Sequence, residues 1–286
     1  MAASAKTLTR EKPRTEGDWT IVLPRRGKQR MNLLKTRISE QEQSWVPTDH
    51  ETNPDRESKL IRKIQVCMKK VESSKFFCTL MDQIQAPEIM HYILTVLGSE
   101  SRMQMVIYGL GSIESYEPPQ FQLVVAILMR KRFSWIGDVE VFDPILSATE
   151  CRALERLGCS VLSINERGCR RALKPTLFFM PHCEVELYDN LVQANWKTGT
   201  LHRILLFGNS FKAYEENVSV FKNSTLVDSG KHVLAVGRFT KEFGINTVSD
   251  DYFGAFHDMS WHFFMVADGE MEGAAVCEMT SEDSNS

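Results

Sequence analysis

The fold of this chain follows from one stretch of its sequence, Met103-Gln104-Met105-Val106-Ile107-Tyr108-Gly109-Leu110-Gly111. A short apolar run that ends at turn residues is typical of a strand buried on both faces. Similar runs lie at residues 139–142, 160–163, 176–180 and 203–207, and helical patterns alternate with the strands. Alternation of this kind favours a parallel sheet. The sequence therefore predicts an α/β, Rossmann-like fold with a mostly parallel sheet and helices on both faces.

The helical patterns complete this architecture. Apolar residues recur at helical spacing from residue 58 to 84, which predicts one long helix, and a second helix is predicted from Pro87 to Leu97. These two form an N-terminal helical segment before the sheet. Ser147 and Glu150 have the spacing of a capping box, so a helix is expected to begin there. Residues 233–236 and 263–266 are candidate late strands.

The composition bounds the class of protein. The chain has 286 residues, 43% of them hydrophobic, with a net charge of −3. A net charge this close to zero excludes a polycation built for nucleic acid. The chain has no run of about 18 consecutive apolar residues, so no membrane span is predicted. The cysteines number seven, an odd count, and none are spaced Cys-x-x-Cys. A disulfide framework or a cysteine-rich zinc module is therefore disfavoured, and a reducing compartment is expected.

Charge is distributed unevenly along the chain. Residues 1–37 hold ten basic and three acidic residues, residues 38–57 hold six acids and one arginine, and residues 268–286 hold six acids and no base. These ends lack the apolar periodicity of a core. We therefore expect a mostly disordered basic-then-acidic segment at 1–55, a folded domain at 56–267 and an acidic disordered tail at 268–286. The basic stretch 25–37 also indicates nuclear import or a polyanion contact, but it lacks interleaved aromatic residues, so no sequence-specific nucleic-acid binding is expected.

Unusual polar residues follow the predicted strands. Carboxyl ends of parallel strands meet at one edge of a sheet, where ligands of such folds bind. We therefore expect a group of residues to converge around one cavity there: Gly109, Gly111, Ser112, Asp143, His182, Cys183, Asn209 and Ser210. The glycines and Asp143 suit a nucleoside or S-adenosylmethionine ligand, although Glu114 stands where the dinucleotide fingerprint has its third glycine. The alternative is a tight structural turn with Asp143 as a cap.

The later residues of this set also have two interpretations. His182 could act as a base and Cys183 as a nucleophile whose pKa a helix N-terminus lowers, or both could pack and cap. Asn209 and Ser210 either face the crevice or shape the next turn. No complete catalytic constellation, metal-ligand set or phosphate loop is found, and His257–His262 is interpreted as a core-edge cluster. No motif in the sequence identifies a cofactor, so the cofactor stays unknown at this point.

Several motifs in order resemble a known family. They are residues 19–27 (Trp-Thr-Ile-Val-Leu-Pro-Arg-Arg-Gly), 108–113, 139–144, the Pro-His-Cys of 181–183 with the Thr-Leu-Phe-Phe-Met before it, 186–191, 194–196 and the Gly-Asn-Ser-Phe of 208–211. The chain resembles the Sensitivity to Red light Reduced family, and more closely an animal SRR-like protein, over roughly residues 18–265. The resemblance implies regulation: light signalling and circadian output in plants, and clock-gene expression and heme biosynthesis in animals, from a mainly cytoplasmic location. It transfers no catalytic residue, and the chain lacks a Cys-Pro heme-regulatory dipeptide.

Two functional classes follow from these observations. In the first, the chain is a non-enzymatic regulator that acts through protein partners. In the second, it is an enzyme or sensor that binds a nucleoside-type ligand in the crevice. The first is favoured because the glycine fingerprint is incomplete, and whether the crevice is open or filled discriminates between them.

Overall fold

The computed structural model describes residues 44–47, 49–196, 198–221, 224–247 and 251–265. Among these, seven strands form one sheet in the order β3-β2-β1-β4-β5-β7-β6. Their bounds are β1 Met103–Tyr108, β2 Ile136–Phe142, β3 Cys159–Val161, β4 Thr176–Met180, β5 Ile204–Asn209, β6 Thr240–Gly244 and β7 Met259–Phe264. The five predicted strands pair in parallel, which confirms the predicted sheet. Strand β7 alone runs antiparallel to its neighbours β5 and β6.

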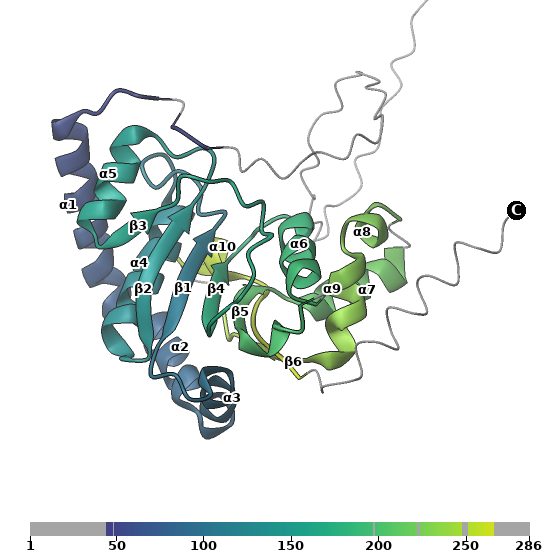
Figure 1. Ribbon diagram of the computed structural model, residues 1–286. Coiled ribbons are helices and arrows are strands. Elements are labelled where there is room, and N and C mark those ends of the chain that lie inside the picture. The colour runs from purple at the N-terminus through teal and green to yellow at the C-terminus, as the bar shows by residue number, and fades with distance from the viewer. Residues whose placement is uncertain (1–43, 48, 197, 222–223, 248–250, 266–286) are drawn as a thin grey trace, which may run out of the picture. The chain divides into compact units, whose positions relative to one another are not determined.

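Helices cover both faces of this sheet (Figure 1). The helices are α1 Pro54–Glu72, α2 Lys75–Gln85, α3 Pro87–Leu97, α4 Glu117–Arg132, α5 Ala148–Arg156, α6 Val185–Trp196, α7 Phe211–Phe221, α8 Ser224–Ser229, α9 Lys231–Val236 and α10 Phe253–Phe256, with short 3-10 turns η1 Leu201–Arg203 and η2 Gly237–Phe239. Helices α1 to α5 and α10 share one hydrophobic cluster with the sheet, and α6, α7 and α9 share the other. The predicted three-layer Rossmann-like architecture with a preceding helical segment is confirmed.

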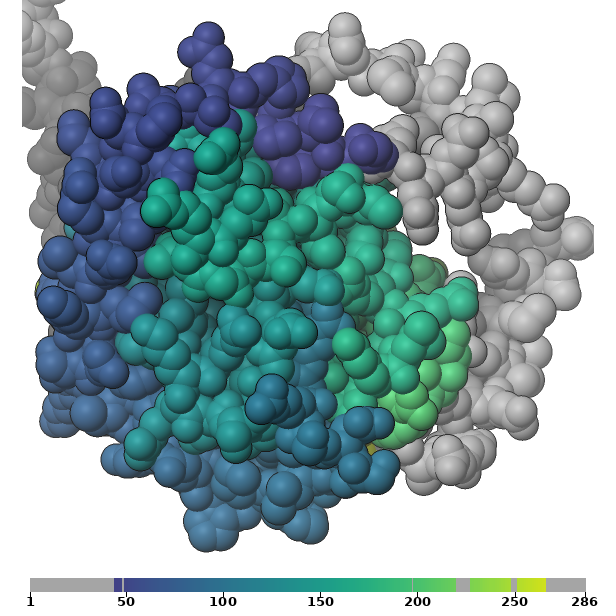
Figure 2. Space-filling model, turned by 60° about the vertical axis from the view of Figure 1, so that its left-hand side comes forward, coloured from purple at the N-terminus to yellow at the C-terminus, as the bar shows by residue number. Residues whose placement is uncertain are grey.

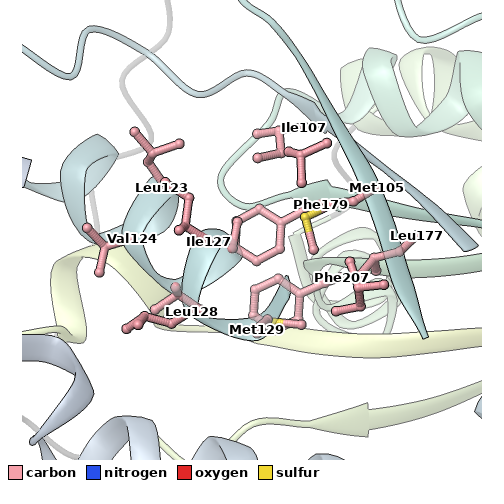
Figure 3. Packing of buried hydrophobic residues seen from close by; sticks show 14 of the residues in the cluster. Met105, Ile107, Leu123, Val124, Ile127, Leu128, Met129, Leu177, Phe179 and Phe207 are labelled. Carbon is pink, nitrogen blue, oxygen red and sulfur yellow. The ribbon is translucent and has the colours of Figure 1, made fainter. Parts of the chain in front are cut away.

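The core on the first face is formed by α4 against the central strands. Helix α4 is buried on almost all sides from Gln120 to Met129, because α1 covers its outer side. Figure 3 shows Leu123 and Ile127 of α4 beside Phe179 and Phe207 of β4 and β5. The two phenylalanine rings stack with centroids 4.9 Å apart. This packing holds β4 and β5 rigidly, so the residues that follow them are placed precisely enough to form a site.

Some sequence predictions differ from the structure. The expected helix at 58–84 is two helices, because the Ser74 hydroxyl accepts a hydrogen bond from the amide of Phe77 and caps a new helix start. Residues 233–236, expected as a strand, lie in α9. Asp189 of α6 accepts hydrogen bonds from the amides of His232 (2.6 Å) and Val233 (3.1 Å), which stabilises the first turn of that helix. The candidate strand at 263–266 overlaps β7.

Candidate functional site

The expected site residues lie at the carboxyl edge of the sheet. The strand order reverses between β1 and β4, so this edge has a topological switch point there. Gly109 and Gly111 follow β1, Asp143 follows β2, His182 and Cys183 follow β4, and Asn209 ends β5 with Ser210 beyond it. The chain therefore brings these predicted residues to one edge, and their contacts decide what each of them does.

The glycine turn after β1 is filled by a neighbouring side chain. Gly109 and Gly111 have φ angles of +66° and +76°, which favour glycine. A Cβ atom at Gly109 would lie 2.5 Å from the Sγ atom of Cys183. That thiol is buried and donates to the carbonyl of Tyr108 at 3.3 Å. Because Gly109 has no side chain, the Cys183 thiol can pack against the β1 turn at the switch point.

The Cys183 thiol is not activated. Burial raises its pKa well above the ordinary value, and the nearby carboxylate of Asp143 adds to the effect. The sequence analysis considered a pKa lowered by a helix N-terminus, and the shift has the opposite sign. A buried thiol with a raised pKa is a poor nucleophile near neutral pH.

Asp143 joins the ends of β1 and β2. The residue is buried, with 6% of its surface exposed. The Oδ2 atom accepts from the amide of Gly111 at 2.8 Å, and Oδ1 accepts from the amide of Ile145 at 2.9 Å. The expected open crevice around this aspartate is instead a closed turn, in which Asp143 bonds the backbone at both strand ends.

Ser112 belongs to a second network at the same edge. Its hydroxyl donates to Oε1 of Glu150 at 2.7 Å, and Glu150 also accepts from the amide of Ser147 at 2.9 Å. The reciprocal bond, from the amide of Glu150 to the Ser147 hydroxyl, completes the predicted capping box. Glu150 therefore ties the glycine loop to the start of α5.

His182 is the exposed member of the predicted set. It has a φ of +56°, an uncommon angle for a residue with a side chain, and its amide donates to Oδ1 of Asn209 at 2.8 Å. Its ring lies with its centroid 4.4 Å from that of His257. Partial desolvation of the ring, together with His257, lowers the pKa of His182, which favours the neutral imidazole. Sequence reasoning placed His257 in a separate cluster and missed this contact.

The remaining polar atoms of this edge bond one another. The Asn209 side-chain nitrogen donates to the carbonyl of Cys183 (3.1 Å) and to the hydroxyl of Tyr214 (2.8 Å). The hydroxyl of Tyr188 donates to the carbonyl of Met180 and accepts from the amide of Asn209. Asn209 is thus a fixed link between β4, β5 and α7.

Ser210 opens a buried network toward β6 and β7. Its hydroxyl and that of Ser260 donate to Oε1 of Glu242 at 2.6 and 2.8 Å. Nε2 of the fully buried His262 lies 3.9 Å from Oε2 of Glu242 and has no hydrogen-bond partner among the described residues. Burial lowers the pKa of His262 to about 4. Because both hydroxyls donate to the glutamate and not to the imidazole, the cluster does not activate a serine.

A strap formed by residues 44–47 and 49–53 covers the ends of β2 and β3. The amide of Trp45 donates to the carbonyl of Ser163 at 2.6 Å, and its indole nitrogen donates to the carbonyl of Pro144 at 3.3 Å. The ring packs edge-on against Phe142 at 5.3 Å. In Figure 2 the purple strap lies against the teal surface. Residues 44–47 and 49–55, which were expected in a mostly disordered segment at 1–55, are therefore packed on the domain. Residues 1–43 and 266–286 lie outside the described residues.

Directly after the strap, an ion pair connects α1 to the glycine loop. Arg56, in the first turn of α1, donates from Nε and Nη2 to the two oxygens of Glu114, at 3.0 and 2.6 Å. Glu114 is the residue that replaces the third glycine of the dinucleotide fingerprint. No signal in the sequence linked Glu114 to Arg56, because the pair forms across 58 residues of chain.

The described residues contain neither a metal-binding cluster nor a membrane-spanning helix. No group of three or more His, Cys, Asp or Glu residues in that part of the chain is arranged to hold a metal ion. Within the same residues, no helix has both the length and the apolar character needed to cross a membrane.

Comparison with known proteins identifies the family. The model of the SRR1 domain matches residues 70–263. The chain belongs to the SRR1 family. It is 53% identical over 254 residues to the Arabidopsis thaliana protein SENSITIVITY TO RED LIGHT REDUCED 1, covering 87% of this chain and 92% of the relative. SRR1-like proteins of Mus musculus (39% identical, 42% of this chain, 49% of the relative) and Drosophila melanogaster (26%, 56% and 55%) also match. The chain thus shares more identity with this plant member than with these two animal members.

The solved structures that match this chain resemble it only distantly. A cofactor-bound protein, Rv0187 from MTB, has a TM-score of 0.38 at 12% identity and covers 73% of this chain and 91% of its own. The plantazolicin methyltransferase BamL in complex with SAH has a TM-score of 0.33 at 12% identity, with 74% and 97% covered. The fold class rests on the sheet itself, and nothing about ligands follows from these similarities.

Proposed function

We propose that this SRR1-family chain is a non-enzymatic regulatory protein that acts through protein partners from a cytoplasmic location. Its proposed roles are those that the family resemblance implies, in light signalling and circadian output and in the regulation of heme biosynthesis. One observation supports the absence of catalysis. At the carboxyl edge, where an enzyme of this fold would bind its substrate, the polar groups are bonded to one another.

The chemistry of those groups supports this proposal. Catalysis needs a nucleophile, acid or base that can reach a substrate. Cys183 is buried with a raised pKa, and the Ser210 hydroxyl is committed to Glu242. The Asp143 carboxylate accepts hydrogen bonds from two backbone amides, and the Asn209 side-chain amide donates to the carbonyl of Cys183. His182 is exposed, and its ring lies beside that of His257, but neither imidazole is shown in a hydrogen bond to a nucleophilic side chain among the described residues.

A complementation experiment tests the regulatory role. The chain and two variants, Cys183→Ser and His182→Ala, are expressed in Arabidopsis plants that lack the 53% identical relative, and the seedling response to red light is measured. We expect all three to restore the response, because neither side chain is needed for chemistry. Failure of the wild-type chain would contradict the light-signalling role. Failure of His182→Ala alone, at normal protein level, would favour a ligand site at this edge.

A second candidate function is supported by the strand order. The reversal between β1 and β4 places the Gly109–Gly111 turn and Asp143 beside the switch point, where nucleoside ligands bind in sheets of this type. The carboxylate oxygens of Asp143 retain lone pairs for a further donor. This candidate takes an adenosine-type ligand or S-adenosylmethionine. Calorimetric titration of both into the wild-type chain decides: saturable heat would support a sensor or enzyme, and no heat would remove the candidate.

A further inference from the structure

The opposite, amino edge of the sheet carries a row of cationic side chains. Gln104, Thr176 and Ile204 lie level with one another on β1, β4 and β5. Arg102 and Lys174 each stand two residues before one of these level positions. His202 does so as well, and its Nε2 atom accepts a hydrogen bond from Nε of the following Arg203 at 3.4 Å. Arg102 lies directly before β1, Lys174 in the loop before β4, and His202 and Arg203 in η1 before β5, so these side chains lie off the amino ends of three neighbouring strands.

The cations of this row are not neutralised within the fold. Arg102 and Lys174 are exposed and Arg203 is half-buried. None of the three forms an ion pair with any residue that the structure describes, whereas Arg130 and Lys241 elsewhere pair with Asp138 and Glu88 at 3.7 and 3.5 Å. Arg203 instead donates to the carbonyl of Leu173. The positive charge of the row therefore remains available to a ligand.

An apolar hollow of about 310 Å³ adjoins the row. Its walls include Tyr92 and Val96 of α3 and Phe263 and Met265 at the end of β7, and His202 belongs to both the hollow and the row. Leu205 pairs with Phe263, and Arg203 and Met265 lie just beyond the ends of these two paired strands, at the same edge of the sheet. Met265 is 49% exposed, which leaves apolar surface open beside the charges.

A second apolar element lies beside the row on the loop before β4. Leu173 is 76% exposed. The loop that presents it is held from below, because the Asn195 side chain accepts from the amide of Ala172 and donates to the carbonyl of Arg170, both at 2.8 Å. The loop therefore presents Leu173 to solvent beside the cations, and the side chain of Arg203 donates to the Leu173 carbonyl. We call Arg102, Leu173, Lys174, His202, Arg203 and the hollow the amino-edge patch.

We propose that the amino-edge patch docks an acidic peptide segment of a protein partner, with an apolar anchor residue seated in the hollow. This proposal rests on the proposed regulatory function and names the surface and the chemistry of the partner. Carboxylates of the peptide complement the row of cations, and the anchor removes the apolar walls from water. Charge complementarity also makes the docking dependent on ionic strength.

Two other occupants fit the patch less well. Single-stranded nucleic acid is held by a charged groove together with stacking aromatic rings. The cations here adjoin an aliphatic leucine and a hollow whose aromatic walls are the buried Phe263 and the half-buried Tyr92. One half-buried ring does not form a platform on which successive bases stack. A second copy of this chain docking through the same patch would place Arg102, Lys174 and Arg203 against their own equivalents, and like charges at an isologous interface oppose association.

The test uses the full chain and a defined probe. The probe is a fluorescein-labelled peptide in which leucines are spaced among glutamates, and its matched control replaces every glutamate by glutamine. Binding is followed by fluorescence anisotropy at two salt concentrations. We expect saturable binding of the acidic peptide that weakens at high salt, and at least about tenfold weaker binding of the glutamine peptide. Absence of binding by the wild-type chain would overturn the proposal.

Variants locate the contact. The double variant Arg102→Glu, Lys174→Glu and the single variant Met265→Glu should each weaken binding by about tenfold or more. The control Lys59→Glu, Arg62→Glu makes the same change in net charge on the exposed side of α1 and should bind as the wild type does. Circular dichroism confirms that each variant is folded. Equal losses in the double variant and the control would overturn the proposal, as would equal competition by an oligonucleotide of matched charge.

The complementation experiment separates this inference from the proposed function. If Arg102→Glu, Lys174→Glu loses the peptide but restores the red-light response, the patch is not the regulatory contact and the inference fails, while the regulatory role stands. If the wild-type chain itself fails to restore the response, the proposed function fails, and the peptide titration still tests the patch.

Discussion

The two edges of the sheet use their polar residues differently. At the carboxyl edge Asp143, Asn209 and Glu150 bond backbone amides and neighbouring side chains, and a strap covers two strand ends. At the amino edge Arg102 and Lys174 form no ion pair with described residues, and apolar walls lie beside them. Residues that looked reactive in the sequence therefore hold strands together, and residues with no catalytic signature remain free for contact.

The largest expected effect comes from filling the glycine turn. Gly109→Ala should lower the free energy of unfolding by about 3–5 kcal/mol, because the new Cβ meets Cys183 and an alanine at φ +66° is strained. Gly98→Ala is the matched control, since Gly98 has a φ of +56° but no atom within 4 Å of a Cβ. With ψ at −118° Gly98 lies outside the left-handed helical region, and its substitution should cost only the conformational part, about 1–3 kcal/mol. Urea unfolding of both variants measures the difference, and equal losses would mean that the turn is not packed against Cys183.

Removal of the Asp143 carboxylate should have the next largest effect. Asp143→Ala leaves two backbone amides, those of Gly111 and Ile145, without acceptors, and we expect a loss of about 2–3 kcal/mol. Asp138→Ala, at a side chain that is 94% exposed, should change stability by less than about 0.5 kcal/mol. A stable, fully folded Asp143→Ala would instead favour an open crevice around this residue.

The pH dependence of stability tests the buried His262. Its pKa in the folded protein, about 4, is below the ordinary value of 6.5, so the unfolded chain takes up a proton first as the pH falls. The stabilising contribution is complete above pH 6.5 and decreases between pH 6.5 and 4, by about 1–2 kcal/mol at pH 5. His262→Gln should lack this part of the pH dependence. Parallel pH profiles for the two proteins, from thermal or urea unfolding, would contradict the neutral buried imidazole.

The smallest effect is expected at the amino edge. Arg102→Glu and Lys174→Glu, which the structure gives no ion pair to break, should each change the free energy of unfolding by less than about 0.5 kcal/mol. A loss near that of Asp143→Ala would show that these cations take part in the fold, and the contrast between the two edges would disappear.

Some elements follow from local sequence. The runs at 103–108 and 176–180 are strands because they are apolar on both sides of the pleat, and Ser147 with Glu150 caps α5 because both partners lie within one turn. Strand β6 escaped prediction, because it lies at the edge of the sheet, pairs with β7 alone and carries polar residues such as Lys241 and Glu242. Helix α9 was misassigned because the group that stabilises its start, Asp189, comes from α6.

The same division holds for the candidate site. The sequence alone determined the five parallel strands and the edge at which Gly109, Asp143, His182 and Asn209 gather, because apolar runs and turn residues act through near neighbours. Only the tertiary structure decided that Cys183 fills the turn at Gly109, that Arg56 holds Glu114 and that three cations align at the other edge. The first two of these contacts join residues 58 or more positions apart, and all three arrangements depend on how the strands and side chains pack, which no local pattern encodes.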